Sequence, residues 1–269
     1  MSSGDQNHPD TRLIAEYVIK NIDAALENDW IKVYYQPVIR TLTGQLCGAE
    51  SLARWVDPEF GFLSPDKFIG ALEASRQIHK LDCFIVNKVC SDISERINNG
   101  LDGVPVSVNF SRLDFEATDM LKVLEDAIAK YDIPKDYIHV EITESMIVSD
   151  ADLMRRVIGS FRDAGYEVWM DDFGSGYSSL TLLKDYYFDT LKLDMDFLKS
   201  FTDRSKSIMT STITMAKDIN IMTLAEGVET AEQLEALKQM GCDIIQGYYL
   251  SKPLPINDFE ELIEKELAK

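Results

Sequence analysis

Apolar residues recur at helical spacing near the start of the chain and then in short runs separated by polar segments. The first pattern predicts a helix from Thr11 to Asn28, with an apolar face of Leu13, Ile14, Tyr17, Val18, Ile22 and Ala25. Eight strand-like runs follow, at 31–39, 44–55, 104–111, 137–144, 167–173, 190–195, 221–227 and 243–250. Amphipathic stretches predict helices at 65–75, 80–98, 114–131, 151–164, 205–219 and 230–240.

Strands and helices alternate from the third strand onward, which favours parallel strands joined by helical crossovers. Eight strands in this order predict an α/β fold, a TIM-type (β/α)8 barrel with a modified first strand. The alternative is an open doubly wound sheet, but the glycine-rich phosphate turn that it requires is not visible. We expect residues 1–10, "MSSGDQNHPD", to be a disordered leader or a cloning remnant, and 11–269 to form one barrel domain.

Composition narrows the range of partners. The 269 residues are 45% hydrophobic and carry a formal net charge of −19, which argues against contact with a nucleic-acid polymer or an anionic membrane. No segment approaches the ~20 apolar residues of a membrane span. Cys47, Cys83, Cys90 and Cys242 form no CxxC pair, which favours reduced thiols in the cytoplasm.

Strand alternation sorts polar from apolar positions, because successive side chains point to opposite faces. In 137–144 it directs Ile138, Val140 and Ile142 toward the helices and His139, Glu141 and Thr143 into the barrel. In 104–111 it directs Val106 and Val108 outward and Ser107, Asn109 and Ser111 inward. The polar residues placed near the ends of the other strands are Gln36, Glu50, Arg54, Asp171, Lys192, Asp194, Glu226 and Gln246.

Such a ring of acids implies a neutralising cation, because like charges brought together raise each other's pKa and cost stability. Ligands that are all oxygen favour a hard ion, Mg²⁺ or Mn²⁺. The adjacent Asp171 and Asp172 could together touch two ions, with one carboxylate bridging both. A single strand-end acid is more often a helix cap or a solvated charge. Recurrence on nearly every strand disfavours that explanation for the set.

The same residues carry a family resemblance. The succession "YYQPVI", "GAESLARW", "VNFS", "EITES", "DDFGSGYSSL", "LKLD", "AEGVE" and "QGYYLSKPL" resembles the EAL-domain phosphodiesterases. The resemblance runs from Ile31 to Leu254, and the first helix resembles the lead-in helix of such domains. It implies a metal-dependent hydrolase that converts cyclic di-GMP to linear 5′-pGpG, with two Mg²⁺ or Mn²⁺ ions activating water.

The resemblance also implies roles for individual residues. The first metal would be bound by Glu50, Asn109, Glu141 and Asp171, and the second by Asp171, Asp172 and Glu226. The implied catalytic residues are Lys192, which orients or deprotonates the attacking water, Glu226, and Glu144, which holds the loop after Asp172. Glu229 matches a position near the metals. The implied substrate contacts are Gln36, Leu52, Arg54, Asp194 and Gln246.

One position departs from the family signature, because Ser51 replaces an alanine between Glu50 and Leu52. Alternation directs Ser51 away from the barrel interior. In that outward position its hydroxyl needs a hydrogen-bond partner. The carboxy-terminal "DFEELIEKELAK" is expected to be a solvated amphipathic helix end.

Two classes of function remain, an active phosphodiesterase and a catalytically silent receptor for cyclic di-GMP or a partner protein. Silent receptors of this family usually lose metal ligands or the lysine, and these positions are all filled here, which favours the enzyme. A barrel lyase with two divalent ions would also show strand-end acids, but the "DDFGSGYSSL" loop and the "QGYYLSKP" ending do not suggest one. The apolar segment 173–188 predicts a homodimer; otherwise Phe173, Tyr177, Leu180 and Leu183 pack on their own barrel. An upstream sensory or GGDEF domain is a further expected partner.

Overall fold

The computed structural model describes residues 11–175 and 179–267. The leader predicted at 1–10 lies outside them. The predicted first helix is confirmed as α1 (Thr11–Glu27), which buries Ile14, Val18 and Ile22. Among the described residues, no helix is both long and apolar enough to cross a lipid bilayer.

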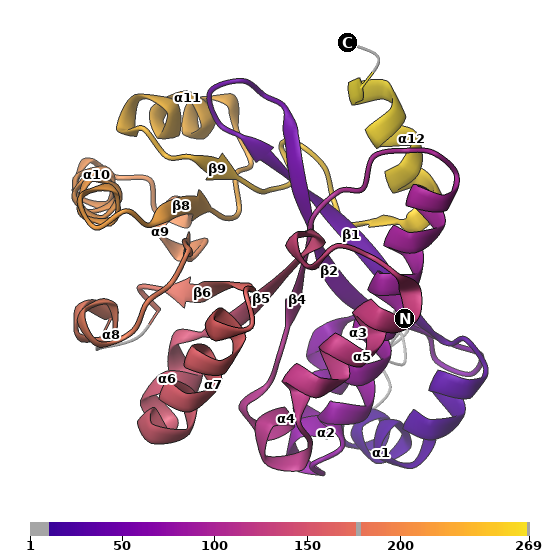
Figure 1. Cartoon of the computed structure of the whole chain (residues 1–269). Helices are drawn as coiled ribbons and strands as arrows, with labels where there is room; N and C mark the ends of the chain where they lie inside the picture. The colour runs from indigo at the N-terminus through magenta and orange to yellow at the C-terminus, as the bar shows by residue number, and fades with distance from the viewer. Residues whose placement is uncertain (1–10, 176–178, 268–269) are drawn as a thin grey trace, which may run out of the picture.

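Eight strands close into a barrel, as predicted (Figure 1). Its strands are β1 (Ile31–Arg40), β2 (Leu46–Asp57), β4 (Val106–Asn109), β5 (Ile138–Thr143), β6 (Glu167–Phe173), β7 (Thr190–Leu193), β8 (Met222–Ala225) and β9 (Ile244–Ile245). The two short strands β3 (Gly61–Leu63) and β10 (Leu254–Pro255) extend it at the edges. Because β1 pairs with both β2 and β9, the sheet has no free edge, and the open doubly wound alternative is wrong.

The modified first strand is confirmed by its direction. β1 is antiparallel to β2 and to β9, whereas every pairing from β2 through β4 to β9 is parallel. A short connection between β1 and β2 allows this reversal, since antiparallel neighbours need no crossover helix. The polar groups near the carboxyl ends of the parallel strands therefore face the middle of β1, where Gln36 lies opposite Glu50.

Helices cover the outside of the barrel (Figure 1). They are α2 (Pro65–Ala74), α3 (Ile78–Asn98), α4 (Arg112–Ala117), α5 (Met120–Tyr131), α6 (Glu144–Ser149), α7 (Ala151–Asp163), α8 (Ser179–Asp185), α9 (Asp196–Lys199), α10 (Asp203–Asp218), α11 (Ala231–Met240) and α12 (Ile256–Leu267), with a 3₁₀ turn at Lys135–Tyr137. The single helix predicted at 114–131 is wrong. The chain breaks at Thr118, because Asp119 caps a new helix by accepting from the Lys122 amide.

Strand alternation sorts β5 as predicted. Ile138, Val140 and Ile142 are buried in the main apolar core, and Glu141 is only 1% exposed. Ser51 is also buried, and its hydroxyl has the partner that it needs, because it donates to the Ser107 carbonyl at 2.7 Å.

The barrel interior is apolar below its polar end. Val38, Trp169, Leu224 and Ile244 form a separate buried cluster contributed by four strands of the barrel. Trp169 also contacts the His139 ring, with centroids 4.7 Å apart. The carboxylates around Lys192 lie above this cluster, where the parallel strands end.

The expectation of a solvated carboxy-terminal helix is wrong for one face of α12. Phe259 and Ile263 are buried, and the Phe259 ring stacks on Tyr35 of β1 with ring centroids 5.3 Å apart. The Tyr35 hydroxyl donates to Asp92 of α3 at 2.6 Å, and Arg96 of α3 pairs with Glu260. Helix α12 thus covers the outer side of the one antiparallel strand.

We expect Phe259→Ala to lower the free energy of unfolding by about 3 kcal/mol, because it removes a buried ring that packs on β1. Phe62→Ala is the matched control, since Phe62 is 58% exposed, and we expect it to cost less than about 1 kcal/mol. Urea denaturation followed by circular dichroism measures both. Equal losses in the two variants would contradict the role given to α12.

Candidate active site

A buried lysine lies at the centre of the polar end of the barrel. Lys192 of β7 is 1% exposed. Its Nζ lies 2.6 Å from Glu141 Oε2, 2.8 Å from Glu226 Oε1, 3.1 Å from Asp171 Oδ1 and 3.6 Å from Glu50 Oε2. These carboxylates come from β5, the segment after β8, β6 and β2, so residues far apart in sequence converge on one ammonium group.

Burial and charge act in opposite directions on this lysine. Burial lowers the pKa of the Lys192 ammonium. Asp171, Glu141 and the other surrounding carboxylates raise the pKa by more than burial lowers it, so it lies well above its usual value. Burial raises the pKa of Glu141 well above its usual range, although Lys192 opposes the shift. The lysine is therefore the group that keeps several acids close together in a dry environment.

The adjacent acids Asp171 and Asp172 are brought to one side by an irregularity in β6. In a regular strand they would point to opposite faces. Here the pairing of β6 with β7 shifts register between Met170 and Phe173, and Asp172 has a φ of +56°. The Asp172 amide donates to Asp171 Oδ1 at 2.9 Å. A left-handed backbone at a residue other than glycine costs about 1–3 kcal/mol, so the rest of the fold must hold it.

The described residues include one compact group that could hold a metal ion. Asp171, Asp172 and Glu226 each offer an oxygen, and these oxygens lie within 4.8 Å of one another. Burial and the neighbouring Asp171 raise the pKa of Asp172 to about 6. Burial also raises the pKa of Glu226 to about 8, although Lys192 opposes the shift. In both groups burial is the largest cause of the raised pKa, and neighbouring carboxylates add to it.

Two further observations fit a divalent cation. Five carboxylates, those of Glu50, Glu141, Asp171, Asp172 and Glu226, surround a single ammonium group. In addition, Glu141 Oε1 is buried and has no hydrogen-bond partner within residues 11–175 and 179–267. A buried acceptor of this kind is costly unless it binds a proton or a cation. The donor set therefore fits hard metal ions.

Amide side chains join the acids into one network. Asn109 Nδ2 donates to Glu50 Oε1 at 2.8 Å. Gln246 Nε2 lies 2.7 Å from Glu50 Oε2 and 3.0 Å from Gln36 Oε1. The amide groups of Gln36 and Gln246 are thus held beside the acids, and Gln246 Oε1 has no partner among the described residues. This network fixes the orientation of Glu50 from two sides.

A cleft of about 320 Å³ opens onto this network. Of the predicted site residues, Gln36, Glu50, Leu52, Asp171, Glu226 and Gln246 line it, together with Glu229. Lys192 and Glu141 lie buried beneath them. Sequence reasoning missed Met195, Gly227, Gly247 and Tyr248 as lining residues. Only their places in the sequence could have indicated them, because Met195 follows the predicted site residue Asp194 and Tyr248 lies two residues after the predicted site residue Gln246.

Two predicted substrate contacts lie beside the cleft and are not among its lining residues. Arg54 is half-buried, its Cζ lies 5.6 Å from the centroid of the Tyr34 ring, and burial lowers the pKa of its guanidinium. Asp194 is half-buried, and its Oδ1 accepts from the Asp196 amide at 2.7 Å. It contributes to the raised pKa of Asp172 and is therefore near the acids.

Glu144 connects the site to the loop after β6. It is 1% exposed at the start of α6, and its Oε2 accepts from the Gly174 amide at 3.2 Å. Phe173 is buried on the same segment. Residues 176–178, which include Tyr177, lie outside the described residues.

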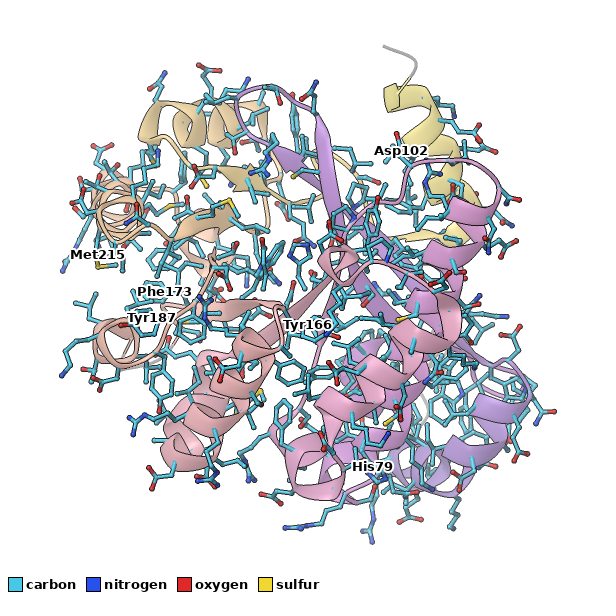
Figure 2. The ribbon with its side chains drawn as sticks, in the orientation of Figure 1. His79, Asp102, Tyr166, Phe173, Tyr187 and Met215 are labelled. Carbon is cyan, nitrogen blue, oxygen red and sulfur yellow. The ribbon has the colours of Figure 1, made fainter. Side chains whose placement is uncertain are left out.

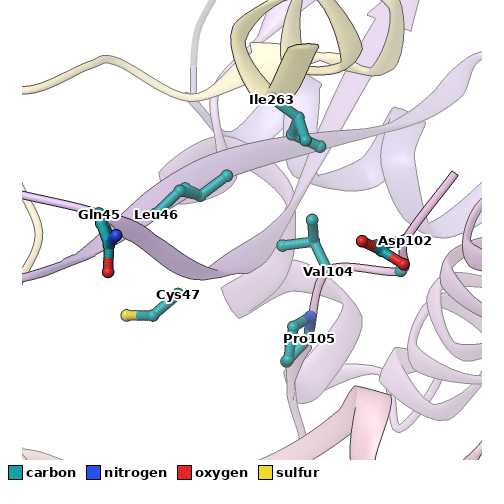
Figure 3. Close-up of a pocket in the computed structure, with 8 residues that line it drawn as sticks. Gln45, Leu46, Cys47, Asp102, Val104, Pro105 and Ile263 are labelled. Carbon is teal, nitrogen blue, oxygen red and sulfur yellow. The ribbon is translucent and has the colours of Figure 1, made fainter. Parts of the chain in front are cut away.

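A second cavity, of about 240 Å³, lies near the starts of β2 and β4, at the opposite end of these strands (Figure 3). It is lined by Gln45, Leu46, Cys47, Asp102, Gly103, Val104, Pro105 and Ile263. Asp102 is the only acidic residue among them. Because this lining cannot concentrate charge, the carboxylate-lined cleft is the stronger candidate for an active site.

Comparisons with known proteins agree with this fold. The sequence profile of the EAL domain matches residues 19–253. Signaling protein YkoW of Bacillus subtilis is 33% identical over 96% of this chain and 32% of its own length. Cyclic di-GMP phosphodiesterase NbdA of Pseudomonas aeruginosa is 32% identical over 89% of this chain and 31% of its own length. The chain therefore spans about a third of the length of these curated relatives.

A solved structure is similar over nearly the whole barrel. The PaMucR phosphodiesterase in complex with c-di-GMP gives a TM-score of 0.84 at 27% identity, covering 90% of this chain and 99% of the solved chain. Because the EAL profile spans most of the sequence and the barrel has the same architecture, this chain belongs to the EAL domain family.

Proposed function

We propose that this domain hydrolyses cyclic di-GMP to linear 5′-pGpG. The observation that carries the proposal is the set of carboxylates around buried Lys192 at the floor of an open cleft. The family supports it, because NbdA is named a cyclic di-GMP phosphodiesterase and PaMucR was solved with c-di-GMP. The free cysteines of the described residues agree with the cytoplasm as the site of action.

Two divalent ions, Mg²⁺ or Mn²⁺, are part of the proposal. Glu50, Asn109, Glu141 and Asp171 would hold one ion, and Asp171, Asp172 and Glu226 would hold the other. When bound, such ions withdraw charge from the phosphodiester and make a water molecule more acidic. The bulge in β6 supports this arrangement, because it is what brings the oxygens of Asp171 and Asp172 close to Glu226.

The protein's own groups would orient the reaction. Lys192 keeps positive charge at the cleft floor, where it orients the attacking water; it could accept the proton of that water only once bound cations offset the carboxylates that raise its pKa. The water oxygen adds to phosphorus and gives up a proton, the P–O3′ bond breaks, and O3′ takes up a proton from solvent, which leaves a linear dinucleotide. Arg54 would bind a non-bridging phosphate oxygen, whose bond to phosphorus does not break. Leu52, Asp194 and the amides of Gln36 and Gln246 would hold the rest of the substrate.

We further propose a homodimer formed through the region of α8. Leu180 is 66% exposed and Tyr187 is 80% exposed, so these two residues do not pack on their own barrel. Figure 2 shows Tyr187 beside α8 at the outside of the molecule. Exposed apolar side chains on one segment are typical of an interface. Glu144 would connect this interface to the acids through Gly174.

The longer relatives also support a sensory or GGDEF domain as a partner in the same chain.

We expect Glu141→Gln to lower cyclic di-GMP hydrolysis at least about 100-fold, because it removes one ligand charge while keeping the side-chain shape. Hydrolysis and bound Mn²⁺, counted by elemental analysis, should fall together while the circular dichroism spectrum stays unchanged. Glu95→Gln is the matched control, because Glu95 is an exposed residue of α3, and this variant should behave as wild type. Turnover near the wild-type rate in Glu141→Gln would contradict the proposed metal site.

Exchange of the ion separates an enzyme from a silent receptor. Ca²⁺ takes more ligands than Mg²⁺, at distances longer by about 0.3–0.5 Å, and a misplacement of about 1 Å can cost ~100-fold in rate. We expect cyclic di-GMP to bind with Ca²⁺, Mg²⁺ or Mn²⁺ but to be cleaved only with the last two, and added Ca²⁺ to inhibit. Calorimetry and chromatography on the same samples measure this. Binding without any linear product in Mg²⁺ and Mn²⁺ would identify a receptor.

We expect Leu180→Glu to weaken the dimer at least about tenfold, because a charge would be placed in an apolar contact. Leu42→Glu is the matched control, since Leu42 is also an exposed leucine, 79% exposed, and lies in the β1–β2 turn. Sedimentation velocity over a concentration series measures both. A wild-type protein that stays monomeric at every concentration would refute the proposed dimer.

A further inference from the structure

The rim of the carboxylate-lined cleft is apolar and exposed. Met195 and Tyr248 line the same cleft as Glu50 and Asp171. Met195 is 46% exposed and Tyr248 is 60% exposed. Large apolar groups that stay open to solvent beside a polar cleft floor are typical of ligand-binding clefts, in which a few polar groups orient the ligand and apolar surface covers it.

The backbone of Tyr248 is fixed next to the acid network. Its neighbour Gly247 approaches Val228 so closely that a Cβ atom there would lie 2.2 Å from the Val228 N and O atoms. The Tyr249 amide donates to the Val228 carbonyl at 2.9 Å, and the Leu250 amide donates to the Gly247 carbonyl at 3.0 Å. These contacts fix the backbone of Tyr248, which lies two residues after Gln246 in the sequence. The side-chain amide of Gln246 donates to Glu50.

Positive charge flanks the Tyr248 ring. Lys252 Nζ lies 5.5 Å from the ring centroid, and Arg54 interacts electrostatically with the Tyr248 hydroxyl. Neither Arg54 nor Lys252 forms a salt bridge with any described residue. Arg54 donates to the Ala53 carbonyl at 2.8 Å. Cations without a carboxylate partner beside an aromatic ring, in a chain of net charge −19, are complementary to a ligand that carries both phosphate groups and aromatic bases.

Met195 is held over the cleft in a comparable way. It packs on Gly227, where a Cβ atom would lie 2.6 Å from the Met195 Cβ. A side chain at Gly227 would displace Met195, and the φ of +70° at Gly227 also favours glycine. The polarisable thioether thus contributes apolar surface to the same cleft as the Tyr248 ring.

We propose that Tyr248 is a substrate-binding residue whose ring stacks on one purine base of the cyclic dinucleotide, while Met195 contacts that ligand across the cleft rim. The inference rests on the proposed function and adds the means of base recognition to it. Every base has a π face, so stacking on Tyr248 selects for a planar base without distinguishing strongly between purines. The ring supplies this contact, and the hydroxyl is not required for it.

The test compares Tyr248→Ala with Tyr248→Phe. We expect Tyr248→Ala to raise KM for cyclic di-GMP on the order of tenfold, the effect of losing one base stack. Its kcat should stay within about twofold, because the lost contact is made equally in the ground state and the transition state. Tyr248→Phe keeps the ring and should restore KM to within about twofold of wild type. Tyr249→Ala, which changes the adjacent tyrosine outside the cleft lining, should leave both constants unchanged.

A second measurement keeps this inference separate from the proposed activity. The dissociation constant of cyclic di-GMP, measured by calorimetry in Ca²⁺, should rise on the order of tenfold in Tyr248→Ala and stay unchanged in Tyr249→Ala. Unchanged affinity in Tyr248→Ala, or equal losses in the Phe and Ala variants, would overturn the stacking role. Wild-type protein that binds but never cleaves the dinucleotide would overturn the proposed hydrolysis alone, because the binding comparison still decides the role of Tyr248.

Discussion

The ion pairs of the buried Lys192 ammonium with four carboxylates are the interaction on which the rest of the structure depends. An isolated ammonium group at 1% exposure would be strongly destabilised. The acids would likewise repel one another without it. The carboxyl ends of β5, β6 and β7 must therefore lie level with Glu50 in the middle of β2, and the apolar cluster around Trp169 and Leu224 fills the barrel below them. The remaining negative charge is what makes the site fit divalent cations.

This charge arrangement also limits how a substrate could approach. A chain with a net charge of −19 repels a dinucleotide with two phosphates at long range. Local positive charge must offset that repulsion at the cleft, and Arg54 and Lys252 lie where it is needed. The floor of the cleft is acidic and its rim is apolar and cationic, so the two parts contact different portions of a ligand.

Local sequence pattern predicted much of the fold and of the site. The alternation in β5 assigned Glu141 to the interior because strand periodicity depends only on neighbouring residues. The order of strands and helices predicted the barrel for the same reason. Asp172 could not be placed in this way, because regular alternation sends it away from Asp171. Only the register shift against β7 and the left-handed backbone bring both oxygens together. The break at Thr118 depends on Asp119 acting as a cap, which a continuous apolar pattern conceals.

Features that depend on distant contacts were missed for a different reason. The burial of Phe259 requires Tyr35, which lies more than two hundred residues earlier in the chain. Tyr248 reaches the cleft because Gly247 packs against Val228, a contact that no local pattern reports.

The most direct measurement of the central claim is a crystal structure with Mn²⁺, in which anomalous scattering locates the ions. We expect two peaks about 3.5–4 Å apart that share Asp171. A single peak, or none, in crystals of protein that cleaves cyclic di-GMP would contradict the two-ion site.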